Sequence, residues 1–218
     1  MSDKYELVLF DLDGTMLDTS PGIFNSVRFA ERQMGFEPIA DERLREFIGP
    51  PPKAMYMKIY GADEETALQA AKYHRQYGRE KAIFEAVVYS GICDLLSELK
   101  SEGIKLGVST LKSQGIAEKV LRNYDLEKYF DVIVGMDEME SLSKCDTIKQ
   151  AIENTNTTGK TLMIGDSNYD YQGALEAKVD FLGVLYGFGF SVGENYSFPA
   201  VQSVVEISDR VMMGEMYQ

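Results

Sequence analysis

A short, wholly apolar run near the start of the chain, Leu7-Val8-Leu9-Phe10, is followed at once by Asp11-Leu12-Asp13-Gly14-Thr15. An apolar run of this length predicts a strand that is buried on both faces of a parallel sheet. Two carboxylates at the carboxyl end of such a strand are unsuited to a core and suited to a site. One carboxylate can act as a nucleophile while its neighbour moves protons, and Gly14 lets backbone N–H groups turn toward an anion.

The rest of the sequence changes character near Tyr89-Ser90-Gly91. Beyond it, helical patterns alternate with predicted strands at 104–109, 132–134, 161–164 and 181–185. This alternation predicts an α/β fold, a doubly wound parallel sheet with a Rossmann-like core and helices on both faces. Between 16 and 87 nearly every segment has a helical pattern, which predicts an inserted α-helical cap domain. The expected domains are therefore an α/β core of residues 1–15 and 88–218 and a helical cap of residues 16–87.

The cap contains several local signals for where its helices begin and end. We expect Ser20 to cap a helix that has Pro21 in its first position, and Asp41 to cap a second, short helix. A further helical pattern covers residues from about 64 to 84. His74, the single histidine, is expected on this helix as a partly exposed residue, so no histidine-based mechanism is available to the chain.

Composition limits the partners that the chain can have. A formal net charge of −13 disfavours a general nucleic-acid binder, which needs a basic surface to displace counterions. Cys93 and Cys145 lie far apart and form no metal-ligand spacing, so we expect reduced thiols. No apolar stretch approaches the ~20 residues of a membrane-spanning helix, and no basic, apolar leader is evident. We expect a cytoplasmic protein, without a membrane or nucleic-acid partner, as a monomer or dimer.

Three further segments place polar residues at predicted strand ends or helix starts. One ends in Ser109-Thr110 with Lys112 just beyond, and another is Ser143-Lys144-Cys145-Asp146 at the start of a helix. The third runs from Gly165-Asp166-Ser167 to Asp170. Each residue alone has an ordinary structural explanation, such as a helix cap or a solvated lysine. Their joint occurrence at the carboxyl edge of one sheet favours a shared site.

These segments resemble the motifs of the haloacid dehalogenase-like hydrolase superfamily, and specifically its helical-cap phosphatases. Asp11-Leu12-Asp13-Gly14-Thr15 matches the first motif, Thr110 the second, Lys144 the third, and Gly165-Asp166-Ser167 with Asp170 the fourth. Phe47-Ile48-Gly49-Pro50-Pro51 and Tyr89-Ser90-Gly91-Ile92 resemble the phosphoglycolate phosphatase-like branch. The resemblance covers nearly the whole chain. Three positions depart from the common pattern: Cys145, Tyr171 and the second motif Ser109-Thr110-Leu111. None of them removes a catalytic group.

The resemblance implies a Mg²⁺-dependent hydrolase for a small phosphate ester. In such enzymes the residue matched by Asp11 attacks phosphorus to give an aspartyl-phosphate, and that matched by Asp13 acts as acid and base. Mg²⁺ would be held by carboxylate oxygens of Asp11 and Asp166 and by the backbone carbonyl of Asp13. Lys144 and the Thr110 hydroxyl would bind phosphoryl oxygens, helped by backbone N–H groups near Leu12 and Asp13. The resemblance also leads us to expect that Asp170 orients either Lys144 or a metal-bound water, rather than binding the metal directly.

The helical insertion is expected to act as a lid whose inner face selects the leaving group. Lys53 is the candidate contact with that group, and a solvated lysine at a helix start is the alternative. Arg75, Arg79 and Lys81 are expected to be surface charges.

Three other functions compete with a phosphatase. A phosphosugar mutase would use the same aspartyl-phosphate and return the phosphoryl group to a sugar. A dehalogenase is disfavoured because Asp13 and the metal site suit phosphoryl transfer. A catalytically silent phosphate-binding module would retain Asp11, Asp13 and Asp166 without using them.

Overall fold

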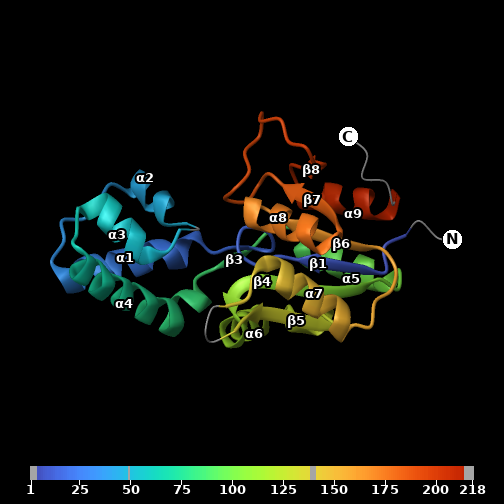
Figure 1. Cartoon of the computed structure of the whole chain (residues 1–218), viewed down its shortest axis with the longest axis horizontal. Coiled ribbons are helices and arrows are strands. Elements are labelled where there is room, and N and C mark those ends of the chain that lie inside the picture. The colour runs from blue at the N-terminus through green and yellow to red at the C-terminus, as the bar shows by residue number, and fades with distance from the viewer. Residues whose placement is uncertain (1–3, 49, 138–140, 214–218) are drawn as a thin grey trace. The chain divides into compact units, whose positions relative to one another are not determined.

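The structure is a computed structural model that describes residues 4–48, 50–137 and 141–213. Contacts divide the chain into two compact units, residues 1–18 with 88–218 and residues 19–87. We call them the core and the cap, and we describe each by itself (Figure 1). No helix in the described ranges is both long and apolar enough to cross a bilayer. Gly49, part of the segment that resembles the phosphoglycolate phosphatase-like branch, lies outside the described residues.

The core contains a six-stranded sheet in which every strand pair is parallel. Its spatial order is β5-β4-β1-β6-β7-β8, so the first strand of the chain lies in the middle. The strands are β1 (Leu7–Phe10), β4 (Lys105–Ser113), β5 (Val132–Met136), β6 (Thr161–Gly165), β7 (Asp180–Val184) and β8 (Ala200–Val201). All four residues of β1 are fully buried, as its apolar sequence predicted. The predicted doubly wound parallel sheet is confirmed.

Helices cover the sheet because each has an apolar face. On α5, for example, Ile92, Leu95, Leu96 and Leu99 recur at helical spacing and are all buried. Helices α7 and α8 pack against each other, and so do α5 and α9 (Figure 1). The helices are α5 (Ile92–Ser101), α6 (Gln114–Asn123), α7 (Lys144–Asn154), α8 (Asn168–Ala177), α9 (Val204–Met213) and the 3₁₀ turn Glu127–Tyr129.

The cap is helical, and its own apolar cluster is centred on the fully buried Tyr56. Its elements are α1 (Ser20–Met34), α2 (Asp41–Leu44), α3 (Pro52–Tyr60), α4 (Glu64–Glu80) and the 3₁₀ turns Arg45–Phe47 and Ala82–Phe84. Strands β2 (Leu17–Asp18) and β3 (Val87–Val88), where the chain passes between the units, form a small separate sheet. That residues 16–87 act as a lid stays a prediction.

Several local expectations need correction. Thr19 rather than Ser20 is the N-cap of α1, and Ala40 rather than Asp41 precedes α2, so Asp41 acts through its charge in the first turn. The helix predicted to run to 84 ends at Glu80, because Lys81 leaves helical geometry. His74 is buried rather than partly exposed, and its ring nitrogen lies 3.3 Å from the hydroxyl of Tyr56.

The largest difference concerns β4, which was predicted to end at Ser109 and instead continues to Ser113. Its register with β5 shifts there, since Ser109 pairs with Val134 and Ser113 with Met136. Four steps along β4 thus match two steps along β5, so β4 bulges between the paired positions. Thr110 and Lys112 lie in this bulge.

Close packing of α8 on α7 generates the first prediction. A Cβ added at Gly173 on α8 would lie 2.7 Å from Cγ of Lys144 on α7. We expect Gly173→Ala to destabilise the protein by about 1–3 kcal/mol through overpacking, although alanine favours a helix by about 1 kcal/mol. Chemical denaturation measures the change. Gly115→Ala on α6 is the matched control, because its Cβ would meet nothing within 4 Å. Equal stability of the two variants would contradict the packing argument.

Candidate active site

The sheet topology brings the predicted site residues of the core to one edge. Asp11 follows β1, and Asp166 follows the adjacent strand β6. Thr110 lies near the end of β4, on the other side of β1. Lys144 is the first residue of α7 and Asp170 lies in the first turn of α8, and these two helices pack against each other. Because the strands are parallel and neighbouring, their carboxyl ends meet at this edge.

Lys144 is the centre of this group. Its Nζ lies 2.6 Å from Oδ1 of Asp11 and 2.6 Å from Oδ1 of Asp170, and all three side chains are buried. Lys144 is the first residue of α7, whose start is fixed by a capping box between Ser143 and Asp146. A local hydrogen-bond motif therefore sets the position of a side chain that contacts Asp11, 133 residues away in the sequence.

The group has more buried negative charge than one lysine can balance. Burial raises the pKa of Asp11, and the carboxylates of Asp170, Asp166 and Asp13 add to the rise while Lys144 opposes it. Burial also raises the pKa of Asp166, to about 6, against the hydrogen bonds that it accepts. Burial by itself would lower the pKa of Lys144, but its two carboxylate partners outweigh it and raise that pKa. The excess charge favours the binding of a proton or a cation here.

Asp166 is held by a loop that the sequence analysis missed. Its Oδ2 accepts hydrogen bonds from the backbone N–H groups of Phe188 at 2.7 Å and Gly189 at 3.3 Å. Gly14, at φ +79°, packs so closely that a Cβ there would lie 2.3 Å from the same oxygen. The signal for this loop was present in the sequence, because Gly187 and Gly189 alternate with aromatic residues directly after a predicted strand.

Asp13 lies beside a different cation. Lys112 on β4 places its Nζ 3.0 Å from Oδ2 of Asp13, while Oδ1 of Asp13 is buried and has no hydrogen-bond partner among the described residues. The backbone N–H groups of Leu12 and Asp13 donate to no backbone carbonyl in the described part of the chain. This leaves donors that fit the predicted contact with phosphoryl oxygens.

The donor set fits Mg²⁺. Carboxylate oxygens of Asp11, Asp166 and Asp170 lie within 4.8 Å of one another, and oxygen ligands suit this hard cation. Both oxygens of Asp170 already have partners, since Oδ1 contacts Lys144 and Oδ2 accepts from the backbone N–H and hydroxyl of Ser167. In the described residues, no hydrogen bond or ion pair uses Oδ2 of Asp11 or Oδ1 of Asp166. This arrangement supports Asp11 and Asp166 as the carboxylate ligands and Asp170 as the partner of Lys144.

Lys53 belongs to the cap, in the first turn of α3. Its Nζ lies 2.5 Å from Oε1 of Glu64, and both side chains are partly or largely exposed. A substrate contact of Lys53 would replace this ion pair, so the predicted role stays a prediction.

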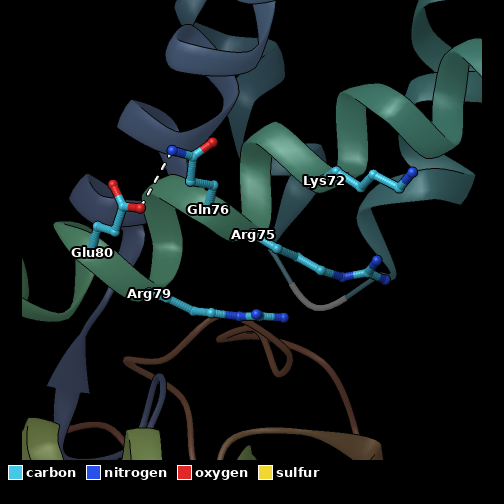
Figure 2. Close-up of a pocket in the computed structure, with 5 residues that line it drawn as sticks. All are labelled: Lys72, Arg75, Gln76, Arg79 and Glu80. Atoms are coloured by element: carbon cyan, nitrogen blue, oxygen red, sulfur yellow. Dashed lines mark hydrogen bonds between the residues drawn. The ribbon is translucent and has the colours of Figure 1, made fainter.

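A second group of cations lies on α4 of the cap. Figure 2 shows Lys72, Arg75 and Arg79 extending from one side of the helix, next to Gln76 and Glu80, which are hydrogen-bonded at 3.3 Å. These five residues line a pocket of about 310 Å³. Arg75 and Arg79 are exposed, as expected of surface charges. None of the five belongs to the aspartate group of the core.

Comparisons with known proteins agree with this arrangement. Residues 8–184 match the family described as haloacid dehalogenase-like hydrolase. A 5′-nucleotidase of Pseudomonas aeruginosa is 35% identical over 188 residues, covering 85% of this chain and 85% of that protein. The tyrosine-protein kinase PtkA of Mycobacterium tuberculosis is 31% identical over 186 residues, covering 84% of this chain and 63% of that protein. The structure of a predicted phosphatase from Clostridium acetobutylicum has a TM-score of 0.81 and 40% identity, covering 96% of this chain and 99% of that chain.

The raised pKa of Asp166 predicts an unusual effect of its neutral analogue. A carboxyl whose folded pKa of about 6 exceeds its ordinary 3.8 stabilises the fold below pH 4, and this contribution is lost as pH rises through 6. Asparagine does not ionise. We therefore expect metal-free Asp166→Asn, in EDTA at pH 7.5, to melt about 6–12 °C above the wild type, and the gap to close below about pH 4.

The comparison of the two proteins cancels the titration of groups that do not interact with Asp166. Asp11 does interact with it, and removing the Asp166 charge lowers the pKa of Asp11, which adds to the expected gain of the variant at pH 7.5. Burial lowers the pKa of His74 to about 4, which acts in the opposite direction over part of this range but equally in both proteins. A lower melting temperature for Asp166→Asn at pH 7.5 would show that the buried carboxylate is stabilised by its surroundings.

Proposed function

The chain belongs to the haloacid dehalogenase-like hydrolase family and is one of its phosphatases, and we propose that it hydrolyses phosphomonoesters of small metabolites with Mg²⁺ through an aspartyl-phosphate. One observation carries this proposal: the buried Lys144 contacts Asp11 at 2.6 Å on an edge of the sheet that also holds Asp13, Thr110 and Asp166. A carboxylate next to a fixed cation and a second acid is the arrangement that phosphoryl transfer through a covalent intermediate needs.

In the first half of the reaction, a carboxylate oxygen of Asp11 attacks phosphorus. The bond between phosphorus and the leaving oxygen breaks, and Asp13 gives that oxygen a proton. In the second half, water attacks phosphorus and transfers a proton to Asp13, which restores the Asp11 carboxylate and releases phosphate.

Other groups of the site hold the phosphoryl oxygens. The Thr110 hydroxyl accepts a hydrogen bond from the backbone N–H of Lys112 at 3.2 Å, so its own proton is free to be donated to an anion. The ammonium of Lys144 and the N–H groups of Leu12 and Asp13 supply further donors where negative charge spreads over the phosphoryl group. Asp170 keeps Lys144 oriented.

Asp11, Asp166 and the backbone carbonyl of Asp13 would hold Mg²⁺. The ion would offset the charge of the carboxylates and polarise a phosphoryl oxygen. Without such a cation, an anionic ester would approach a group of four aspartates balanced by Lys144 and Lys112.

The leaving group is proposed to be selected by the cap, with Lys53 as the contact. The segments around Phe47 and Tyr89 favour a phosphoglycolate-like ester, whereas the 5′-nucleotidase relative suggests a nucleoside monophosphate as the substrate to compare. A phosphosugar mutase would produce an isomer instead of free phosphate. A silent phosphate-binding module would bind without turnover. A panel of metabolite phosphates, assayed for both phosphate and isomer, separates these possibilities.

Asp11→Asn tests nucleophilic catalysis. The amide is nearly isosteric but cannot attack as a carboxylate, so we expect kcat to fall by more than about 10³-fold with the fold retained. Steady-state kinetics measure kcat, and a thermal melt shows whether the variant is folded. Asp209→Asn, the same change at an exposed position of α9, is the matched control. Activity of Asp11→Asn within about tenfold of wild type would rule out this role.

Chelation tests the metal. EDTA is expected to remove activity and Mg²⁺ to restore it, because four buried or partly buried aspartates otherwise repel the substrate. Asp166→Ala should need far more Mg²⁺, since it removes one of the two carboxylate ligands. Full activity of the wild type after exhaustive chelation would be incompatible with the proposed site.

A further inference from the structure

Lys112 is a charged residue of the site that the proposed mechanism does not use. It lies in the bulge of β4, where the register with β5 shifts between Ser109 and Ser113. Bulges next to active sites commonly redirect a side chain. Here the side chain of Lys112 is three-quarters buried, and its Nζ lies 3.0 Å from Oδ2 of Asp13. The irregularity of the strand therefore coincides with a contact to the proposed acid.

Lys112 contacts two site residues with two different groups. Its ammonium forms an ion pair with the carboxylate of Asp13 at 3.0 Å, and its backbone N–H donates to the hydroxyl oxygen of Thr110 at 3.2 Å. Asp13 follows β1 and Thr110 lies on β4, which pair as neighbouring strands. Lys112 thus contacts both the carboxylate of Asp13, which follows β1, and the hydroxyl of Thr110 on β4.

The two oxygens of Asp13 differ in their surroundings. Oδ2 is held by Lys112, whereas Oδ1 is buried and has no partner among the described residues. Buried polar atoms are nearly always hydrogen-bonded, so an exception requires an explanation. A carboxylate anchored through one oxygen presents the other in a fixed direction, which is what an acid that protonates a leaving group needs.

We propose that Lys112 is a positioning residue, which anchors Asp13 through Oδ2 so that Oδ1 faces the oxygen of the departing group. This inference rests on the proposed function and deepens it, because it says which substrates depend on Lys112. An alkyl phosphate has a poor leaving group that must receive a proton as its bond to phosphorus breaks. A 4-nitrophenyl phosphate has a good leaving group that departs as an anion without one. Lys112 therefore matters most for alkyl esters, the class to which most metabolite phosphates belong.

The test compares Lys112→Met with wild type on a series of aryl and alkyl phosphates of increasing leaving-group pKa. Methionine keeps the length of the side chain and removes its charge. We expect kcat/KM to fall at least ~30-fold for alkyl esters, towards the ~10²–10⁴-fold that general acid catalysis contributes, and only ~3-fold for 4-nitrophenyl phosphate. The slope of log kcat/KM against leaving-group pKa should become steeper. Lys112→Arg, which keeps the charge, should recover most of the alkyl activity.

Lys105→Met is the matched control. Lys105 lies on the same strand and forms an ion pair with Glu6 at 2.8 Å, with a side chain that is 37% exposed against 24% for Lys112. It lies at the opposite end of β4 from the site. We expect less than a twofold change for either class of substrate. Melting curves of all variants establish that each one is folded.

A second arm shows whether Lys112 acts through Asp13. In the background of Asp13→Asn, Lys112→Met should cause little additional loss on alkyl esters, because the acid that it positions is already gone. The proposal would be overturned if Lys112→Met lowered alkyl-ester activity by the same factor in the Asp13→Asn background as in the wild type. An equal loss of aryl and alkyl activity, or no loss at all, would also overturn it. Two results would contradict the proposed function itself, and this inference with it. One is that the wild type hydrolyses no phosphate ester, and the other is that the loss of activity caused by Asp13→Asn is the same for every leaving group.

Discussion

The rest of the site depends on the buried ammonium of Lys144 and its two carboxylate partners. Removing one partner from such a group leaves an uncompensated charge, which typically destabilises a protein by about 3–5 kcal/mol. Lys144 nevertheless cannot neutralise Asp11, Asp166 and Asp170 together, and the raised pKa values of Asp11 and Asp166 express this imbalance. The site therefore has an excess of buried negative charge, which a divalent cation would balance.

The surrounding backbone makes this arrangement rigid. The capping box at Ser143 fixes the start of α7, the one at Ser167 occupies an oxygen of Asp170, and two amides of the loop at 188–189 hold Asp166. Asp11 and Asp166 thus each have one oxygen fixed by an ion pair or hydrogen bonds, and Asp170 has both. Fixed donors and acceptors do not have to reorganise when charge develops during a reaction, which is the main source of electrostatic catalysis.

The sequence was sufficient to predict the sheet, because Leu7–Phe10 and the later apolar runs have the length and apolar composition of buried parallel strands. It was also sufficient to place Asp11, Asp166 and Lys144 at one edge, since parallel topology implies that strand ends meet. It did not give the continuation of β4 to Ser113 or the ion pair of Lys112, because a bulge depends on the neighbouring strand. His74 lies on the buried face of α4 together with Ala67, Ala70 and Ala71, but its burial was missed because the sequence does not show that Tyr56 packs against this face.

The central position of β1 has a consequence for how the chain comes to be folded. Leu7 pairs with Lys105 on one side and with Thr161 on the other, so the first of its neighbours in the sheet lies 105 − 7 = 98 residues further along. At a synthesis rate of ~5–20 residues per second, roughly 5–20 s pass between the synthesis of β1 and that of β4. During this interval a wholly apolar strand must avoid pairing with other chains, while the intervening helical residues 19–87 are already able to form contacts of their own. The strand that leads to Asp11 is thus made before every other strand of its sheet and is enclosed only after β4 and β6 have followed.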